Sequence, residues 1–468
     1  MSERPTTHQK AFQINLDPAQ HGTFAEIGAG QEIARWFFHV GGAASTVAKT
    51  ISAYDMAIGD ALYGPTDRYV SRRRLAAMLD HEYTLLLEQL GPKRGRTTRF
   101  FVFADTVAAR SYTRHEEGHG WLGVRFQYQP LAEPTEIVIH VRLLDTENIR
   151  EQEALGIIGV NLIYGALHYH TAPSTLIASL MDGLTCERIE VDMIKFGGPC
   201  FAGVDNRLMS LQLIEQGFTD AAIFTVEGEV VHPADALHKR PVLILRGSFR
   251  PVTNLVIDML ERAKVQFETE LQESREQPVV VMEMSLQDLR RGQRIDHADF
   301  LARADILGAL GQMVMISSFA YYYRVTPFLR RYTSKPIAFA MGVPALTELF
   351  DEKYYADLSA GILEAMAGLF KRDVLVFVYP SLDPATGQLI TAETFMVGQH
   401  LRHLHAYLLE NHFLQSIRAM NKNYLHISPR DVIAKIQSGD PTWETMVPTT
   451  VTERIKQHQL FGIMTSNT

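Results

Sequence analysis

The chain has 468 residues, of which 46% are hydrophobic and 21% are charged, and its formal net charge is −8. This composition is typical of a globular protein long enough to form two or more domains. The acidic balance excludes a nucleic-acid binder that depends on a uniformly basic surface, and no apolar run approaches the ~20 residues of a membrane-spanning helix.

Two cysteines, Cys186 and Cys200, are the only thiols in the sequence. They are too few for a four-cysteine zinc or iron–sulfur site, and their spacing forms no C-x-x-C pair. Residues 1–8 lack the apolar core of a signal peptide. We therefore expect a cytoplasmic protein that contacts neither membrane nor nucleic acid.

The first 98 residues are predicted to form an arm followed by a helical section. Residues 1–30 are polar and contain glycine, which favours an extended arm. Ser45 is a candidate cap for a helix with Val47, Ile51 and Ile58 on one face. Ser71 is a candidate cap for a second helix that ends near a basic turn.

Residues 99–186 change to the alternation of strands and are predicted to form a small antiparallel β element plus a helix. Three strands are expected at residues 100–104, 121–126 and 136–141, the last two joined by a Pro-containing turn. A helix is expected over residues 148–167.

The main α/β domain is predicted over residues 187–390, because short apolar runs there alternate with segments long enough for crossover helices. Such runs, rich in Val and Ile, fit strands buried on both faces of a mostly parallel sheet. The runs are residues 188–194, 222–226, 241–245, 278–282, 312–316, 336–340 and 374–378. The spacing allows an open sheet or an irregular barrel, and we favour the open sheet. Residues 391–468 are predicted to be a helical section, with helices at 391–420 and 431–437.

Ligand sites of parallel sheets lie beyond the carboxyl ends of the strands, so polar residues there are candidates. Arg246, Ser248 and Arg250 follow the run at 241–245 in the sequence Arg-Gly-Ser-Phe-Arg. Two arginines beside a glycine suit a phosphate or carboxylate group, and a helix starting near Thr253 would add its positive end. The alternative is that both arginines satisfy helix carbonyls and surface acids.

A second candidate loop follows the run at 188–194. Lys195, Gly197 and Gly198 form a glycine-rich turn that is suited to holding a phosphate through backbone N–H groups, with Arg207 nearby. Asp205 is a candidate acid–base residue, or simply the cap of the helix that follows.

Two further carboxylates, Asp105 and Glu283, each follow a predicted strand. Such residues are able to act as general bases or to bind a divalent cation, for which Mg²⁺ is the candidate cofactor. Their alternative role is to stabilise a turn.

A fourth candidate is Ser317 and Ser318, with Arg324 following. This segment resembles the I-S-S-T-x-x-R element of nicotinamide and nicotinate mononucleotide adenylyltransferases, although Phe319 stands in place of Thr and Arg324 comes two residues late. The H-x-G-H element of those enzymes has its nearest match at residues 115–119, with one extra residue.

Other patterns are better explained structurally. Residues 41–50 are superficially similar to a phosphate loop, but Ala48 replaces its final glycine and a cap explains the segment better. Three histidine pairs are candidate metal ligands or ordinary surface and core residues: His115/His119, His168/His170 and His403/His405.

Most of the chain resembles a bacterial protein family without an established activity. Its members carry the conflicting labels nicotinate or nicotinamide mononucleotide adenylyltransferase and TonB-dependent receptor. The resemblance is strongest at residues 28–60, 203–210 and 341–355. The receptor label disagrees with the sequence, which lacks both an export signal and a set of amphipathic strands.

These patterns lead to two hypotheses. The first is an enzyme, or an enzyme-like binder, of a nucleotide or other small anionic ligand, with nucleotidyl or phosphoryl transfer as its reaction. The second is a non-catalytic assembly protein that forms a homo-oligomer through aromatic patches at residues 36–38, 321–323 and 354–355, which otherwise belong to the core.

Overall fold

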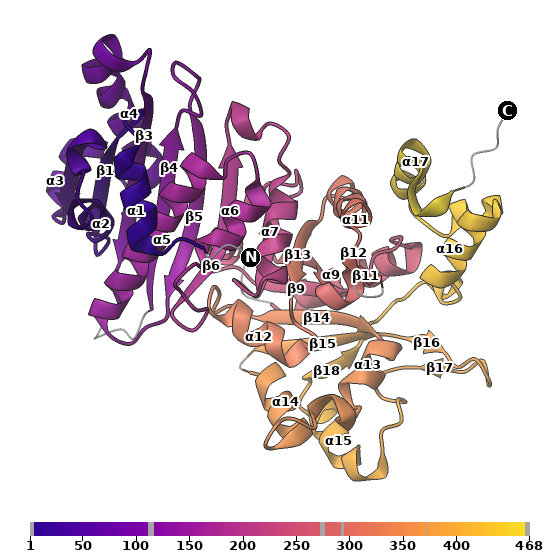
Figure 1. Ribbon diagram of the computed structural model, residues 1–468. Helices are drawn as coiled ribbons and strands as arrows, with labels where there is room; N and C mark the ends of the chain where they lie inside the picture. The colour runs from indigo at the N-terminus through magenta and orange to yellow at the C-terminus, as the bar shows by residue number, and fades with distance from the viewer. Residues whose placement is uncertain (1–3, 111–116, 272–276, 292–293, 372, 464–468) are drawn as a thin grey trace. The chain divides into compact units, whose positions relative to one another are not determined.

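The computed structural model describes residues 4–110, 117–271, 277–291, 294–371 and 373–463. Its contacts divide the chain between Asp220 and Ala221 into two compact units, each of which is an α/β structure around its own sheet and core. Each unit is described separately below (Figure 1).

The first unit contains a six-stranded mixed sheet of order β2-β1-β3-β4-β5-β6. Strands β1, β2 and β3 are parallel, and β4, β5 and β6 continue the sheet with antiparallel pairing. The strands are β1 Gln20–Gly28, β2 Val47–Ala53, β3 Arg99–Ala108, β4 Gly118–Phe126, β5 Thr135–Leu143 and β6 Ile189–Gly197.

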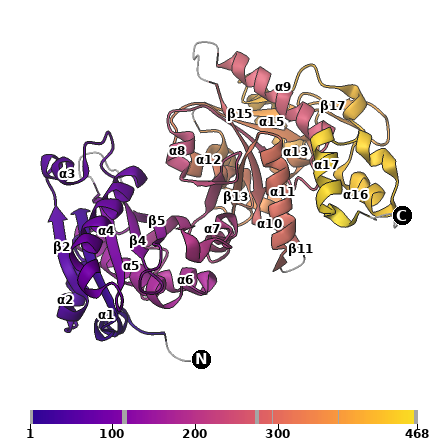
Figure 2. The same ribbon diagram turned by 90° about the horizontal axis from the view of Figure 1, so that it is seen from above.

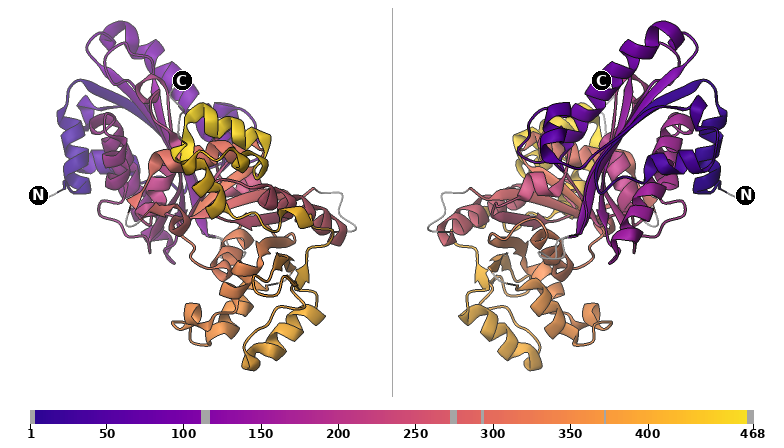
Figure 3. Two further views of the ribbon diagram at one scale, coloured as in Figure 1. Left: turned by 90° about the vertical axis from the view of Figure 1, so that its right-hand side faces the viewer. Right: turned by 90° about the vertical axis from the view of Figure 1, so that its left-hand side faces the viewer.

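Helices cover both faces of this sheet (Figure 3). Helix α4 packs on β1, β3 and β4, and α5 packs on the opposite face together with its neighbours α1, α2 and α6. The helices are α1 Thr7–Leu16, α2 Ile33–His39, α3 Met56–Tyr63, α4 Arg72–Arg94, α5 Asn148–His168, α6 Pro173–Leu180 and α7 Asn206–Glu215.

The sequence prediction for the N-terminal part was wrong in two places. Residues 4–30 form α1 and β1 rather than an extended arm, and Ser45 ends a short 3-10 turn before strand β2 instead of capping a helix. Val47 and Ile51 are four residues apart, a spacing that places side chains on one face of a helix and equally on one face of a strand. Ser71 does cap α4, where its Oγ accepts a hydrogen bond from Arg74 N at 3.2 Å.

The first unit also takes a strand from the segment predicted as the start of the main α/β domain. Strand β6 pairs antiparallel with β5, so residues 189–197 form an edge strand of the first sheet. The predicted small antiparallel element is therefore one half of a larger mixed sheet.

The second unit contains an eight-stranded open sheet of order β18-β15-β14-β9-β10-β13-β7-β8. All neighbouring strands from β18 to β13 are parallel, while β7 and β8 are antiparallel. The strands are β7 Ala221–Phe224, β8 Val230–Val231, β9 Val242–Arg246, β10 Val279–Ser285, β13 Met313–Ser317, β14 Ile337–Gly342, β15 Val374–Tyr379 and β18 Leu414–Ser416. Two short ribbons, β11 Arg290–Arg291 with β12 Arg294–Ile295 and β16 Ser381–Leu382 with β17 Leu389–Ile390, lie outside this sheet.

The parallel strands follow the 3-2-1-4-5-6 order of doubly wound folds. The chain runs outward from β9 through β10 to β13, and then returns to the other side of β9 to form β14. The order therefore reverses between β9 and β14, and a crevice is expected there beyond the carboxyl ends of both strands. Five of the seven apolar runs predicted for a mostly parallel sheet are the parallel strands β9, β10, β13, β14 and β15. The run at 222–226 corresponds to β7, which pairs antiparallel with β13, and the run at 188–194 corresponds to β6 of the first sheet.

The helices between these strands are α8 Pro233–Leu237, α9 Asn254–Glu270, α10 Leu286–Leu289, α11 His297–Ala309, α12 Tyr322–Arg330, α13 Val343–Leu349, α14 Gly361–Leu369 and α15 Arg402–Glu410. Helices α16 Pro429–Ser438 and α17 Thr449–His458 follow the last strand. The predicted helix over 391–420 was wrong, because only residues 402–410 are α-helical and β18 follows at Leu414. The predicted helix over 431–437 is confirmed as part of α16.

Candidate functional site

Three of the predicted site residues meet at the carboxyl edge of the second sheet. Arg246 ends β9, Glu283 lies near the end of β10 and Ser317 ends β13. Arg246 and Glu283 are register partners on neighbouring strands, so their side chains lie next to each other. The sheet thus brings together one arginine, one carboxylate and one hydroxyl from three neighbouring strands.

The Arg246 guanidinium is held by a two-pronged ion pair. Its Nε donates to Glu283 Oε2 at 2.9 Å, and its Nη2 donates to Oε1 at 2.6 Å. Ser317 Oγ donates to the same Oε1 at 2.7 Å, and the guanidinium also lies 4.7 Å from the centre of the Tyr322 ring. Burial acts to lower the pKa of Arg246, but the charge of Glu283 outweighs it and raises the pKa. Arg246 is therefore a permanently charged, fixed group.

A cavity of about 380 Å³ lies beside Arg246. Its walls come from the segments that follow four adjacent parallel strands, β14, β9, β10 and β13, so it occupies the crevice where the strand order reverses. The lining residues are Arg246, Gly247, Ser285, Gln287, Asp288, Ala320, Tyr321, Tyr322, Ala345, Glu348, Leu349, Tyr354 and Tyr355.

Tyrosine rings form one wall of this cavity. The Tyr321 ring centre lies 5.6 Å from that of Tyr354 and 6.2 Å from that of Tyr355. Tyr355 is fixed by its hydroxyl, which donates to Leu349 O at 2.9 Å. Burial raises the pKa of Tyr322 and of Tyr355, so both phenols remain neutral hydrogen-bonding groups. The wall offers flat aromatic faces to a planar ligand.

Two carboxylates complete the cavity. Asp288 Oδ2 accepts a hydrogen bond from Ser285 Oγ at 2.6 Å in the capping box of α10, and Glu348 lies exposed on α13. Because the charge of Arg246 is already balanced by Glu283, these two carboxylates make the lining acidic. A phosphate group would fit beside them with a cation bound.

The other predicted residues of the second unit lie elsewhere. Arg250 pairs with Asp299 (Nε–Oδ1 2.8 Å) and covers the Phe461 ring, and the Ser248 carbonyl accepts from Arg303 Nη1 at 3.1 Å. Helix α9 does begin after Thr253, as predicted. Its first N–H group, that of Asn254, donates to Met446 O and is therefore already used within the protein. The expected pairing of Arg246 with Arg250 and the helix end in one anion site was therefore wrong.

Of the predicted site around Ser317, Ser318 and Arg324, only Ser317 belongs to the group around Arg246. Ser317 is buried against Glu283, whereas Ser318 is exposed. Arg324 lies on α12 and covers the Tyr323 ring at 5.8 Å. Ser318 and Arg324 do not line the cavity.

Asp105 belongs to the first unit and lies inside β3 rather than after it. It is the register partner of Glu26 on β1, and both carboxyl groups are buried. Burial first, and then the charge of Glu26, raise the pKa of Asp105, whose Oδ1 accepts only one hydrogen bond, from Ile27 N at 3.3 Å. Burial raises the pKa of Glu26 to about 7, even though Ile33 N and Ala34 N at the start of α2 donate to it.

The predicted glycine-rich phosphate turn also lies in the first unit. Lys195 and Gly197 are in β6. Gly198 has a φ of +92°, and a Cβ there would lie 2.8 Å from Pro134 O. Asp205 caps α7 and pairs with Arg207 (Oδ2–Nη2 2.8 Å). Burial acts to raise the pKa of Asp205, but the hydrogen bonds from Arg207 lower it. Asp205 and Arg207 satisfy each other, as the structural alternative expected.

Histidines form one polar chain that the sequence analysis did not anticipate. His140 Nδ1 lies 2.6 Å from Asp192 Oδ1, and His119 Nδ1 lies 3.2 Å from His140 Nε2. His140 therefore lies between Asp192 and His119 and contacts one of them through each ring nitrogen. His115, the first residue of the predicted H-x-G-H match, lies outside the described residues.

The sequence analysis missed Asp288, Glu348 and the role of Tyr354 in the cavity. In the sequence, Tyr354 and Tyr355 were recognised only as an aromatic pair, which fits an interface or a hydrophobic core equally well. Glu348 is separated by 65 positions from Glu283, and only the order of the strands brings their segments to one edge. The one sequence signal of Glu348 was its place eight residues after the run at 336–340.

No family model and no curated protein matches this chain. Among solved structures, a competence/damage-inducible protein from Agrobacterium tumefaciens aligns at 16% identity and a TM-score of 0.25, over 35% of this chain and 97% of that one. A competence-damaged (CinA) superfamily protein from Klebsiella pneumoniae aligns at 12% identity and a TM-score of 0.27, over 35% and 99%. Nicotinic acid mononucleotide adenylyltransferase from Plasmodium falciparum aligns at 10% identity and a TM-score of 0.26, over 48% and 98%.

TM-scores of this size do not establish a shared fold, so the site is interpreted from its own geometry. Among the described residues, no helix is both long enough and apolar enough to cross a lipid bilayer.

Proposed function

We propose that the second unit binds a nucleotide together with Mg²⁺ in the cavity beside Arg246. The observation that supports this most is the position of the cavity at the reversal of strand order between β9 and β14. Doubly wound sheets bind their ligands in this crevice, because loops from both directions of winding diverge there.

Each part of the lining has a role in this proposal. The tyrosine wall, with Tyr321 and Tyr354, stacks against the base. Asp288 and Glu348 bind Mg²⁺, which usually takes one or two protein carboxylates and completes its shell with water and phosphate oxygens. Arg246, oriented by Glu283, faces the phosphate chain as a fixed positive charge.

The reaction class that suits these groups is phosphoryl or nucleotidyl transfer. An acceptor oxygen attacks a phosphorus atom, the bond to the leaving oxygen breaks, and the leaving group carries away the negative charge. Such reactions need positioning and charge stabilisation more than covalent chemistry. Mg²⁺ and Arg246 would supply the charge stabilisation in this cavity.

The test is thermal denaturation of the full chain with millimolar adenosine, ATP, CTP or pyrophosphate, each with and without Mg²⁺. A ligand that binds the native state raises Tm, and at 100 times its Kd it stabilises by about 2.7 kcal/mol. We expect ATP and CTP to raise Tm in a manner that depends on Mg²⁺. Release of pyrophosphate or phosphate then measures transfer.

Two matched controls locate the site. Glu348→Gln should abolish the Mg²⁺-dependent part of the rise, while Glu261→Gln, at an exposed glutamate on α9, should leave it intact. Tyr354→Ala should weaken nucleotide binding, while Tyr407→Ala, at an exposed tyrosine on α15, should not. A nucleotide response that survives both cavity variants would place the site elsewhere.

A further inference from the structure

The outermost strand of the first sheet, β2, has one unpaired edge. It pairs with β1 only, and among the described residues no other strand pairs with its outer side. Figure 2 shows β2 at the outside of this unit. Four of its seven residues are exposed, so neither helices nor loops cover it as they cover the inner strands. Its outward N–H and C=O groups are a ready template for another strand.

Apart from one irregularity near its start, where Val47 and Lys49 pair with consecutive residues of β1, this edge has little of what usually prevents strand pairing. Strands at sheet edges are commonly protected by proline, by inward-pointing charges or by several lysines. Here Lys49 is the only charged residue of β2, and its ammonium group pairs with Glu82 on α4 of the same unit. The charge of Lys49 is therefore balanced within the unit.

Large apolar side chains are exposed at the end of α2, the helix that precedes β2 in the chain, and directly after β2. Phe38, at the end of α2, is 53% exposed, and Tyr54, Met56 and Ile58, which directly follow the strand, are 78%, 63% and 53% exposed. The one charged residue among them, Asp55, is directed to its own helix, where its Oδ1 accepts from Ala57 N at 2.9 Å. Exposed apolar groups beside an open strand edge mark an interaction surface.

We propose that two copies of this chain associate through β2, antiparallel about a two-fold axis, so that the six-stranded sheets of both copies join edge to edge. The regular part of β2, residues 49–53, is about 17 Å long, which suits a short antiparallel pairing. Stable interfaces bury about 1,600 Å² in total, more than one strand pair provides. Tyr54, Met56 and Ile58 supply the additional apolar area on either side of the axis.

A second copy fits this edge by symmetry and by charge. With Ile51 of each copy at the axis, Lys49 lies opposite Ala53 of the other copy, so the two lysines do not face each other. A two-fold arrangement also uses the same patch on both partners and closes after two subunits, which prevents open-ended growth. This proposal is independent of the nucleotide site in the second unit.

The test is the mass of the full chain in solution, measured by sedimentation and light scattering at micromolar concentrations. We expect a dimer for the wild type and a monomer for Ile58→Glu combined with Met56→Glu. The matched control is Ile149→Glu, which places the same change at a 73% exposed isoleucine on α5 and should leave the dimer intact. Because these side chains are exposed, all variants should retain the wild-type circular dichroism and Tm of the dissociated chain.

Hydrogen exchange distinguishes strand pairing from simple apolar contact. Amides of residues 47–53 should exchange slowly in the dimer and at least 10-fold faster in the monomeric variant. A wild type that is monomeric, a dimer that survives Ile58→Glu with Met56→Glu, or equal exchange in both forms would overturn the proposal.

Discussion

Glu26 and Asp105 face each other across the parallel pair β1 and β3, and both carboxyl groups are buried in the first unit. Glu26 receives two backbone N–H groups from the start of α2, whereas Asp105 receives one. Asp105 Oδ2 has no hydrogen-bond partner in the described part of the chain. Two buried carboxylates this close favour a state in which at least one holds a proton.

This pair predicts how the stability of the first unit depends on pH. Raised folded-state pKa values mean that the folded state binds more protons than the unfolded state. The contribution of Glu26 and Asp105 to the free energy of unfolding is therefore fully present below their ordinary pKa values, and it is lost as pH rises through the raised values. For Glu26 the window runs from the ordinary value of 4.5 to about 7. Urea unfolding between pH 5 and pH 8 should show decreasing stability.

Asp105→Asn removes the charge that must be buried at high pH. We expect this variant to exceed the wild type by about 1–3 kcal/mol in free energy of unfolding at pH 8, with a smaller gain at pH 5. Asp67→Asn, at an exposed aspartate, is the control and should change neither value. An equal gain at both pH values would show that the carboxyl is not the titrating group.

Gly30 predicts a steric effect at the same carboxyl group. A Cβ at position 30 would lie 2.4 Å from Asp105 Oδ1, whereas a Cβ at Gly203 would meet nothing within 4 Å. Gly30→Ala should therefore destabilise the first unit by about 1–3 kcal/mol, as overpacking does. Gly203→Ala should be neutral or stabilising by up to about 1 kcal/mol. Equal effects in chemical unfolding would contradict the close packing of Gly30 on Asp105.

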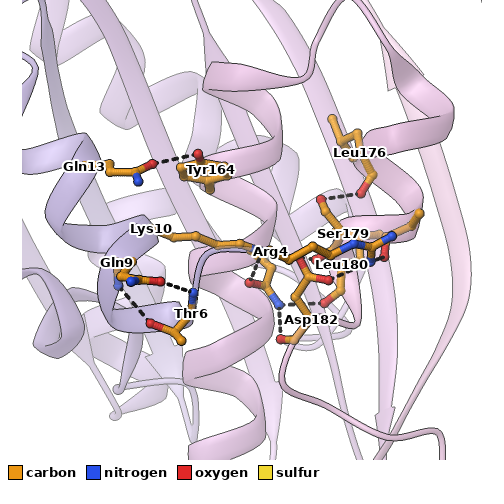
Figure 4. Close-up of polar contacts among 12 residues, drawn as sticks. Arg4, Thr6, Gln9, Lys10, Gln13, Tyr164, Leu176, Ser179, Leu180 and Asp182 are labelled. Atoms are coloured by element: carbon orange, nitrogen blue, oxygen red, sulfur yellow. Dashed lines mark hydrogen bonds and ion pairs between the residues drawn. The ribbon is translucent and has the colours of Figure 1, made fainter. Parts of the chain in front are cut away.

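Lys10 and Arg4 bind the same carboxylate, Asp182, from very different environments (Figure 4). Lys10 is fully buried and also donates to Asn161 Oδ1 at 2.8 Å, while the Arg4 side chain is 64% exposed. Burial lowers the pKa of Lys10, and Asp182 acts against that shift.

These two contacts should therefore differ in energy. Lys10→Ala should cost about 3–5 kcal/mol, because it leaves a carboxylate that is largely removed from solvent without its buried partner. Arg4→Ala should cost less than about 1 kcal/mol. Chemical unfolding of both variants measures the difference, and similar losses would mean that the buried contact adds nothing.

The pair of Arg246 and Glu283 predicts an effect on folding as well as on binding. Glu283→Gln leaves a buried guanidinium without its charge partner, and we expect it to destabilise the second unit by about 3–5 kcal/mol. Arg250→Ala removes a more exposed ion pair and should cost less. For this reason Glu348→Gln, rather than an arginine variant, is the appropriate test of ligand binding. A fully stable Glu283→Gln variant would argue against a buried ion pair.

Much of the second unit follows from the sequence alone. Runs such as Val242–Leu245 and Val374–Val378 have no polar residue, so they must be buried on both faces, and segments between them allow crossover helices. Local chemistry likewise determined the caps Ser71, Thr253 and Asp205, because a hydroxyl or carboxylate at a helix start binds the nearest N–H groups. The pairing of Arg246 with Glu283 required only that their strands be neighbours.

Tertiary structure decided the rest. Strand β1 contains Gln20, His21 and Glu26, which are polar but buried, so no local apolar pattern marks this strand. Asp205 and Arg207 formed a local pair, while Asp288, Glu348 and Tyr354 met through the reversal of strand order at β9. Residue spacing predicts which side chains share a face of one helix or strand. Only the order of strands in the sheet determines which loops line the same crevice.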